Sequence, residues 1–421
     1  MLRWLYGEAM QKLRLTKPVR RIALTRIAGQ FGDGMIQVSI AGYLLFSPER
    51  QTSAPQIAFV LAVTLLPYSL VGPAIGVLAD VIDRRNIVVY GNAIRAAVSL
   101  LLLLVVLGSS SQALLAITIL LLLGIDRFVL SVLSTVLPRI VSGKELVAID
   151  GYLPTMGTVA AATGAATAVG ITAIFDSITA ALITASMLYL LAATAATGFV
   201  RGSLGPDTKL AWHATRAKAI EDVVQGISVL AKTKPARYAL LSITAQRVAF
   251  GAFTVASILT ARATYDEESQ ALGVVAGSFA VAAIVAGTIG ISTPTAVNRM
   301  KRETWLLLLS VLSAIAVIAA QFAPALLALG LAGFAVTCAP GGNKVLTDER
   351  LQVTIPDTHR GRAFAIYDTA INSAVVIGAA VCALLSDYIQ IFDLLLVVSL
   401  TTITLGWFWS RIANAGIATN A

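Results

Sequence analysis

One apolar stretch near the N-terminus carries ionisable and amide side chains at helical spacing. Arg26, Gln30, Asp33 and Gln37 follow one another at steps of four, three and four residues within the apolar run 22 to 46. On an α-helix this spacing places all four side chains on one face. A carboxylate in such a stripe can take up and release a proton, while the guanidinium and the amides can bind polar groups of a solute. We therefore predict a proton site at Asp33 and solute contacts at the other three residues.

Two later apolar runs add candidates for the same chemistry. Asp126 and Arg127 are adjacent, as are Gln246 and Arg247. Adjacent helical residues point about 100° apart, so Asp126 and Arg127 are expected to face different neighbouring helices. Asp126 is a second candidate for the proton site, and Arg127, Gln246 and Arg247 are further candidates for solute contacts. A structural ion pair of Asp33 with Arg127 or Arg247 explains the same charges equally well.

Composition places these residues inside a membrane. The 421 residues are 57% hydrophobic and only 13% charged, against about 25% charged in soluble domains. Crossing a bilayer core of roughly 30 Å takes about 20 apolar residues. Such runs lie near 22–46, 55–79, 87–108, 112–137, 149–174, 177–200, 237–262, 269–292, 303–322, 324–347, 362–386 and 388–410. Within the third run, Arg95 is interpreted as a snorkelling or structurally paired residue.

The predicted fold is all-α and polytopic, with twelve transmembrane helices in two pseudo-symmetric six-helix halves. Residues 1–21 form a basic amphipathic N-terminal segment, 22–200 the first half, 201–236 a linker with an amphipathic helix, and 237–421 the second half. The segments that open the two halves share Arg, Ala, Leu, Ile and Gln in register, from Arg21 to Gln30 and from Arg237 to Gln246. Parallel halves of this kind place a solute site between them near mid-depth.

Positive charge fixes the predicted orientation. With both termini inside, the inner segments hold 24 of the 31 Lys and Arg residues and the outer segments hold two. Basic residues accumulate on the cytoplasmic side of membrane proteins. We expect a multi-pass protein of the cell membrane with cytoplasmic termini, and this bias accounts for the net charge of +9 without nucleic acid as a partner.

Enzyme and metal chemistry find no support in the residue patterns. The chain has no His-Glu metal motif, no Gly-x-Ser-x-Gly elbow and no phosphate-binding loop. Both histidines lie in polar connections, and both cysteines lie in apolar runs, where packing is the favoured role. No cofactor is indicated.

A charged loop between the second and third runs carries a family resemblance. The stretch Gly76-Val-Leu-Ala-Asp80-Val-Ile-Asp83-Arg84-Arg85 resembles the loop between the second and third helices of major facilitator superfamily transporters. We predict that Asp80, Arg84 and Arg85 latch the cytoplasmic side shut, with Asp80 facing the start of the eleventh helix. The predicted cytoplasmic gate comprises Gly76, Asp80, Asp83, Arg84, Arg85, Asp150, Lys344, Arg362 and Asp368.

Further motifs are similar to one branch of that superfamily, the drug:proton antiporters that include macrolide-efflux and enterobactin-exporter proteins. They are Gln30-Phe-Gly-Asp-Gly-Met-Ile-Gln37, Asp83 in the loop, Leu137-Pro-Arg-Ile-Val141 and Arg360-Gly-Arg-Ala-Phe364. The resemblance implies a monomeric transporter in contact with membrane lipids. It would export an amphipathic small molecule, such as a drug-like compound or a siderophore, through alternating access driven by proton entry.

Two positions depart from the antiporter pattern. Val81 stands where an Arg commonly follows the loop Asp, and the fifth helix has Ala165 where antiporters often carry a Gly-Pro pair. The alternative is a facilitator or flippase that moves a lipid or a cell-envelope precursor without proton antiport.

Overall fold

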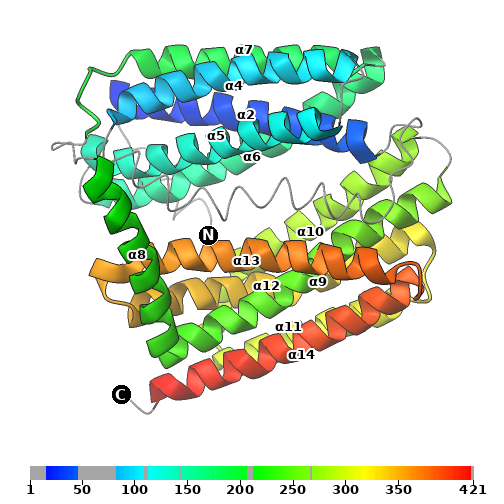
Figure 1. Cartoon of the computed structure of the whole chain (residues 1–421). Helices are drawn as coiled ribbons and strands as arrows, with labels where there is room; N and C mark the ends of the chain where they lie inside the picture. The colour runs from blue at the N-terminus through cyan, green and yellow to red at the C-terminus, as the bar shows by residue number, and fades with distance from the viewer. Residues whose placement is uncertain are drawn as a thin grey trace. The chain divides into compact units, whose positions relative to one another are not determined.

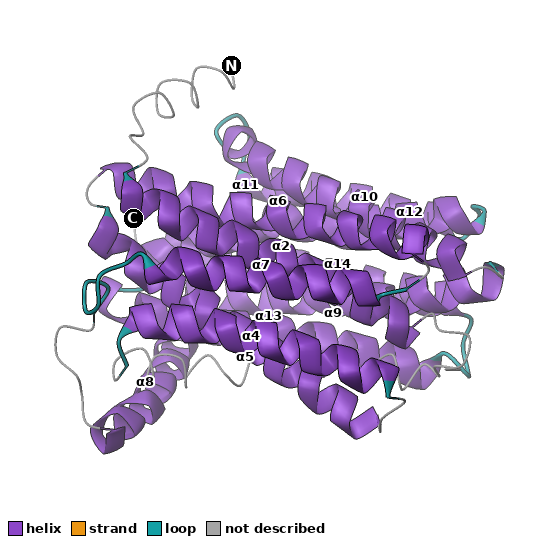
Figure 2. Cartoon of the chain, turned by 90° about the horizontal axis from the view of Figure 1, so that it is seen from above, coloured by secondary structure: helices purple, strands orange, loops and turns teal. Residues whose placement is uncertain are grey.

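The computed structural model describes residues 16–45, 82–108, 112–141, 144–175, 177–205, 212–265 and 268–418. The predicted run 55–79, together with Gly76 and Asp80, lies outside the described residues, as does most of the basic N-terminal segment. Within the described part, every regular element is a helix and no strand occurs (Figures 1 and 2).

The observed helices correspond to the predicted apolar runs. They are α2 (Lys17–Leu45), α4 (Arg84–Leu107), α5 (Gln112–Ile140), α6 (Lys144–Phe175), α7 (Thr179–Thr197), α8 (Trp212–Lys232), α9 (Lys234–Thr264), α10 (Glu268–Val297), α11 (Arg302–Ala320), α12 (Ala325–Thr354), α13 (Asp357–Leu385) and α14 (Ile391–Ala418). Ten of them are long and apolar enough to cross a membrane. The predicted all-α polytopic fold class is therefore confirmed. An amphipathic helix in the linker was also predicted, and α8 occupies that place.

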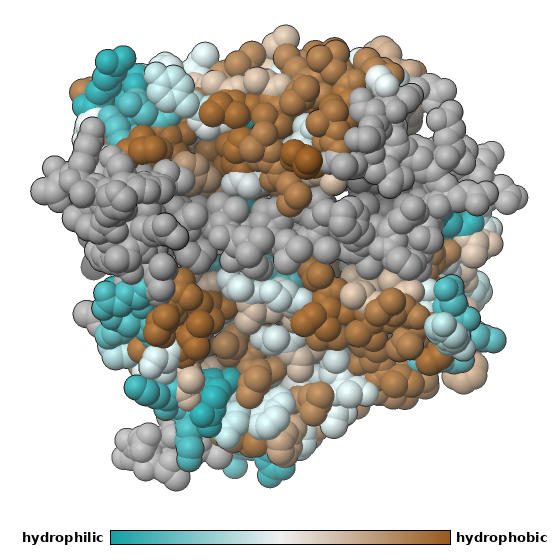
Figure 3. All heavy atoms as spheres, viewed as in Figure 1, coloured by the Kyte–Doolittle hydropathy of each residue, from teal (hydrophilic) through white to brown (hydrophobic). Residues whose placement is uncertain are grey.

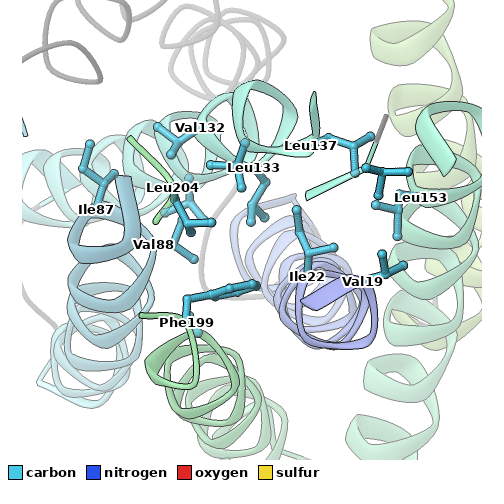
Figure 4. Packing of buried hydrophobic residues seen from close by; sticks show 14 of the residues in the cluster. Val19, Ile22, Ile87, Val88, Val132, Leu133, Leu137, Leu153, Phe199 and Leu204 are labelled. Carbon is cyan, nitrogen blue, oxygen red and sulfur yellow. The ribbon is translucent and has the colours of Figure 1, made fainter. Parts of the chain in front are cut away.

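The described helices divide into two compact units. One contains α2 and α4 to α7, the other contains α9 to α14, and the division falls within α8, between Ala219 and Ile220. Each unit has its own buried core. In the first, side chains from α2, α4 and α5 meet those of the segment after α7, with Ile22, Val88, Leu133 and Phe199 all buried (Figure 4). This core holds together the ends of the helices whose middles carry the charged residues.

The outward surfaces of the helices are apolar. Large side chains such as Leu104, Ile117, Ile284 and Ile291 are more than half exposed. On the face that Figure 3 shows, hydrophobic residues cover broad areas and hydrophilic residues gather toward the margins. Soluble monomers rarely expose apolar patches of this extent. Lipid is the solvent that suits such a surface.

Paired glycines bring α2 and α6 into backbone contact. A Cβ atom at Gly34 would overlap the Ala161 carbonyl, and one at Gly164 would overlap the Phe31 carbonyl. Small residues allow such close approach of membrane helices. The two glycines thus fix the distance between α2 and its neighbour at the level of Asp33.

The second unit also contains a pair of helices in close contact at two glycines. A Cβ at Gly251 in α9 would overlap the Val375 carbonyl in α13, and one at Gly378 would overlap the Val248 carbonyl. Each unit therefore contains one helix pair joined by reciprocal glycine contacts, which agrees with the repetition seen in the sequence.

We predict that Gly164→Ala destabilises the protein while Gly170→Ala does not. Both glycines lie in α6, but a Cβ at Gly170 meets no atom within 4 Å. Overpacking of a tight contact costs about 1–3 kcal/mol. Thermal unfolding of the detergent-solubilised protein should show a lower midpoint for the first variant only. Equal midpoints for the two variants would contradict the close helix contact.

Candidate functional site

A buried arginine in α4 binds two aspartates from two other helices. The Nη2 atom of Arg95 forms an ion pair with Oδ1 of Asp33 in α2 and lies 3.3 Å from Oδ1 of Asp126 in α5. The three residues are 1%, 6% and 3% exposed. The two carboxyl groups are close enough to influence each other electrostatically. Charged residues that are far apart in sequence thus form one cluster within the first unit.

Two neighbouring side chains hold this cluster in place. The Tyr189 hydroxyl in α7 donates a hydrogen bond of 2.8 Å to Asp33 Oδ1, and the Arg95 guanidinium lies 4.1 Å from the centre of the Tyr189 ring. Arg95 Nη1 donates to Asn92 Oδ1 at 2.9 Å, while Asn92 Nδ2 donates to the Val88 carbonyl at 2.8 Å. The orientation of the guanidinium is therefore fixed from two sides.

Glycines on α2 make room for these groups. A Cβ at Gly32 would lie 2.9 Å from the Tyr189 ring, and one at Gly29 would lie 3.3 Å from Arg95 Nη1. The first distance is shorter than real Cβ contacts and the second is tight, so the tyrosine ring in particular depends on a residue without a side chain. In the Gly-Asp-Gly sequence of α2, Gly32 thus leaves space for Tyr189 of α7, and Gly34 allows close backbone contact with α6.

The cluster has one cation in direct contact with two acids. Several of its atoms, Asp33 Oδ2, Asp126 Oδ1 and Arg95 Nε, are buried and have no hydrogen-bond partner in the structure. The Arg127 guanidinium attracts Asp126 as well, but more weakly than Arg95 does. An uncompensated charge in a membrane interior is costly. Arg95 therefore supplies one positive charge to two carboxyl groups.

The residues of the predicted polar stripe on α2 contact different neighbouring helices. Asp33 faces α4 and α7, whereas Arg26 and Gln30 lie against α6 at Gly157, where a Cβ would overlap the Gln30 amide oxygen. Gln37 is exposed. The four residues lie on one helix as predicted, but their side chains have different surroundings, and their role in solute contact stays a prediction.

Asp126 and Arg127 face differently, as expected for adjacent helical residues. Asp126 reaches across to α4 and is buried, whereas Arg127 is only partly buried. The sequence analysis named Arg127 and Arg247 as possible ion-pair partners of Asp33. In the structure Asp33 pairs with Arg95, a partner that the sequence analysis did not name.

The second unit holds a separate polar network around Gln246. Asn343 Nδ2 in α12 donates to Gln246 Oε1 at 2.9 Å and to Ser242 Oγ at 2.7 Å, and Ser242 in turn donates to the Gly406 carbonyl in α14. Three helices are joined by these bonds. Gln246 is buried, while its neighbour Arg247 is only partly buried.

Part of the predicted cytoplasmic gate joins α4 to the end of α7. The Asp83 carboxylate accepts from the backbone N–H of Arg85 at 2.9 Å and of Gly202 at 2.8 Å. The Arg85 side chain donates to the carbonyls of Phe199 and Thr197 at 2.7 and 3.0 Å, and the Arg84 N–H bonds a further carbonyl of this loop. These contacts lie within one unit. Asp80 lies outside the described residues, so the latch predicted there stays a prediction.

The other predicted gate residues are spread over the second unit and α6. Lys344 bonds Asp348 one turn along α12 at 2.6 Å, and Arg362 at the start of α13 donates to Gln225 in α8. Asp368 is exposed on α13, and Asp150 lies near the start of α6. Arg362 therefore connects the linker helix to α13.

Three residues of the charged cluster were missed or undervalued in the sequence. Arg95 was interpreted only as snorkelling or structurally paired, and neither Asn92 nor Tyr189 was singled out. Asn92 and Arg95 are three residues apart in an apolar run, which places them on one helix face, and that spacing was a usable signal. Nothing in the sequence distinguishes Tyr189 from a packing residue.

Comparison with known families agrees with this architecture. Residues 22–354 match the family model described as Major Facilitator Superfamily. The chain belongs to the major facilitator superfamily. Two superfamily relatives, from Mycobacterium bovis and Mycobacterium tuberculosis, are described as uncharacterised MFS-type transporters. Each is 29% identical over 379 residues, covering 87% of this chain and 84% of the relative.

Solved structures of other transporters resemble this one in fold. The nucleoside transporter NupG matches with a TM-score of 0.68 at 12% identity, covering 93% of this chain and 98% of its own. A bacterial homologue of the iron transporter ferroportin, in an outward-facing state, matches with a TM-score of 0.59 at 16% identity and the same coverage. At these identities the likeness concerns the fold alone.

We predict that Arg95→Met destabilises the protein and that adding Asp33→Asn restores part of the loss. Removing one partner of a buried ion pair costs about 3–5 kcal/mol, because the remaining charge is left uncompensated. Without Arg95 the two acids repel each other, and neutralising one of them relieves that repulsion. Thermal unfolding measures both effects, and Arg411→Met, at an exposed arginine, is the control. Strictly additive losses in the double variant would contradict the shared contact.

Proposed function

We propose that this superfamily transporter exports an amphipathic small molecule in exchange for protons. The observation that carries the proposal is the sharing of Arg95 by Asp33 and Asp126. Intramembrane ionisable residues are costly and typically mark ion or proton pathways. Two carboxyl groups that compete for one guanidinium form a site where binding one proton changes the ion pairing of three helices.

The proton would act by changing which contacts hold α2, α4 and α5 together. A protonated Asp33 attracts Arg95 less strongly, so the guanidinium is held chiefly by Asp126, and Tyr189 loses a charged acceptor. Loss of the proton reverses these preferences. A ligand shifts a conformational equilibrium only through different affinities for the two states. The cluster provides such a difference for the proton, which is what alternating access requires.

The proposed solute contacts are those that the sequence indicated. They are Arg26, Gln30, Gln37, Arg127, Gln246 and Arg247. Arg26 and Gln30 flank Gly157 in α6, and Arg127 and Arg247 are partly buried guanidiniums within predicted spans. A few polar groups among apolar walls are typical of small-molecule sites. NupG transports nucleosides and the ferroportin homologue is related to an iron transporter, so the shared fold does not specify the solute.

The proposed setting is the cytoplasmic membrane with both termini inside. The distribution of Lys and Arg supports this orientation. It places Asp83, Arg85 and α8 on the inner side, where the contacts of Arg85 with the α7 carbonyls and of Arg362 with α8 would stabilise the cytoplasmic ends of the helices.

A facilitator or flippase for a lipid or a cell-envelope precursor is the second candidate. Val81 and Ala165, at two positions where antiporters carry other residues, favour it. In that case the charged cluster would only hold helices together, and transport would not depend on a pH gradient.

We predict that Asp33→Asn and Asp126→Asn each abolish accumulation driven by a proton gradient, because one neutral side chain removes the competition for Arg95. Asp387→Asn, at an exposed acid on the segment after α13, is the matched control. The assay measures transport into reconstituted vesicles, with and without an imposed gradient, for a lipophilic cation, a macrolide, a siderophore and a lysolipid.

Full gradient-dependent transport by both cluster variants would refute proton coupling at this site. Loss in Asp126→Asn alone would assign the proton to α5. Wild-type transport that is unaffected by the gradient would favour the facilitator.

A further inference from the structure

A second cluster of charged residues, with more cations than acids, lies in the other unit, between α9, α12 and the start of α13. Arg247 is halfway along α9, and its Nε atom is buried without a hydrogen-bond partner. The acidic groups that act on it are Asp348 and the Tyr367 hydroxyl. Asp348 already bonds Lys344 at 2.6 Å. Lys344 pairs with Asp348 directly and Arg247 lies within its electrostatic influence, so two cations act on one carboxylate here, whereas two carboxylates act on one cation at Arg95.

The Tyr367 hydroxyl and the Asp348 carboxylate lie near each other, and both act on Arg247. The Asp348 carboxylate is thus already engaged with Lys344 and Tyr367. The Lys344 ammonium lies 5.8 Å from the Tyr367 ring centre. A buried N–H that lacks an acceptor costs free energy, and a ligand oxygen that accepts a hydrogen bond from Arg247 Nε offsets that cost. The chemical group that fits is an anion.

An aromatic surface lies beside the guanidinium. The Arg247 guanidinium carbon is 5.9 Å from the Phe250 ring centre. Phe250 packs edge-on against Phe279 in α10 at 6.0 Å, and both rings contact Phe253. Phe250 and Phe279 are only partly buried, whereas Phe253 is fully buried. The two accessible rings can pack against an aromatic or aliphatic part of a ligand, in the offset or edge-to-face arrangements that rings prefer.

We propose that Arg247 binds the acidic group of the transported molecule and that Phe250 and Phe279 pack against its aromatic portion. The substrate class is therefore an aromatic organic anion, such as a carboxylate. This inference rests on the proposed function as a small-molecule transporter. It selects anions over lipophilic cations because the excess charge around Arg247 is positive.

Anion recognition and proton binding lie in different units. Arg247, Phe250 and Phe279 belong to the second unit, and Asp33, Arg95 and Asp126 to the first. A substitution at one cluster leaves the contacts of the other intact. Equilibrium binding can therefore be tested without a proton gradient, and its outcome is independent of whether transport is proton-coupled.

The experiment measures equilibrium binding of radiolabelled 2-naphthoate and 2-naphthamide to the full chain in nanodiscs. The carboxylate and the amide have nearly the same shape and differ in charge. We expect wild-type protein to bind the carboxylate at least about tenfold more tightly, in line with hydrogen bonds to charged groups. Arg247→Gln should lose this preference and Arg247→Lys should keep part of it. Arg411→Gln, at an exposed arginine of α14, should behave as wild type.

Phe279→Leu should weaken both probes alike, since the rings contact the shared naphthalene. Tetraphenylphosphonium should fail to displace bound 2-naphthoate. Equal wild-type affinities for the two probes, absence of carboxylate binding, an unchanged preference in a folded Arg247→Gln variant, or displacement by the cation would each overturn the proposal. If the anion preference holds while Asp33→Asn retains gradient-driven transport, the substrate class stands and proton coupling at Asp33 fails.

Discussion

The ion pairing of one buried arginine is the constraint on which the first unit depends. Arg95 cannot lose its charge inside the membrane, so its neighbours must supply negative charge and hydrogen-bond acceptors. Asp33 and Asp126 supply the charge from α2 and α5, and Asn92 supplies a neutral acceptor. Four helices are thereby tied at one depth, because Tyr189 adds α7 through Asp33. In these contacts two carboxyl groups compete for the guanidinium of Arg95.

The helices around Arg95, Asp33 and Asp126 are closely packed, so the pairing of these residues is coupled to the packing of the helices. Gly29 and Gly32 admit the guanidinium and the tyrosine ring, and Gly34 holds α2 in backbone contact with α6. Packed interiors respond to change by switching between discrete arrangements instead of deforming smoothly. In the proposed mechanism, a change in the pairing of Asp33 would reach the backbone of α2 and, through the glycine contact, α6. The second unit repeats the reciprocal glycine contact in α9 and α13, and it carries Arg247 midway along α9.

Sequence reasoning predicted the helices well and the partners poorly. Long apolar runs can be recognised from the sequence alone, so eleven predicted spans correspond to helices whose ends differ from the predicted bounds by up to eight residues. The stripe containing Asp33 was visible because helical periodicity is local. The pairing of Asp33 with Arg95 joins residues 62 positions apart, and no local pattern encodes which of several arginines approaches. Tyr189 was not identifiable either, since a tyrosine in an apolar run has the same appearance whether its hydroxyl binds a carboxylate or a carbonyl.

The central claim is that Asp33 and Asp126 hold one exchangeable proton between them. Infrared difference spectroscopy between acidic and alkaline pH, on purified protein in lipid, reports the carbonyl band of a protonated carboxyl group. The geometry around Arg95 predicts such a band in wild-type protein, altered in Asp33→Asn and in Asp126→Asn and absent when both are replaced. A band that persists unchanged in the double variant would contradict the claim.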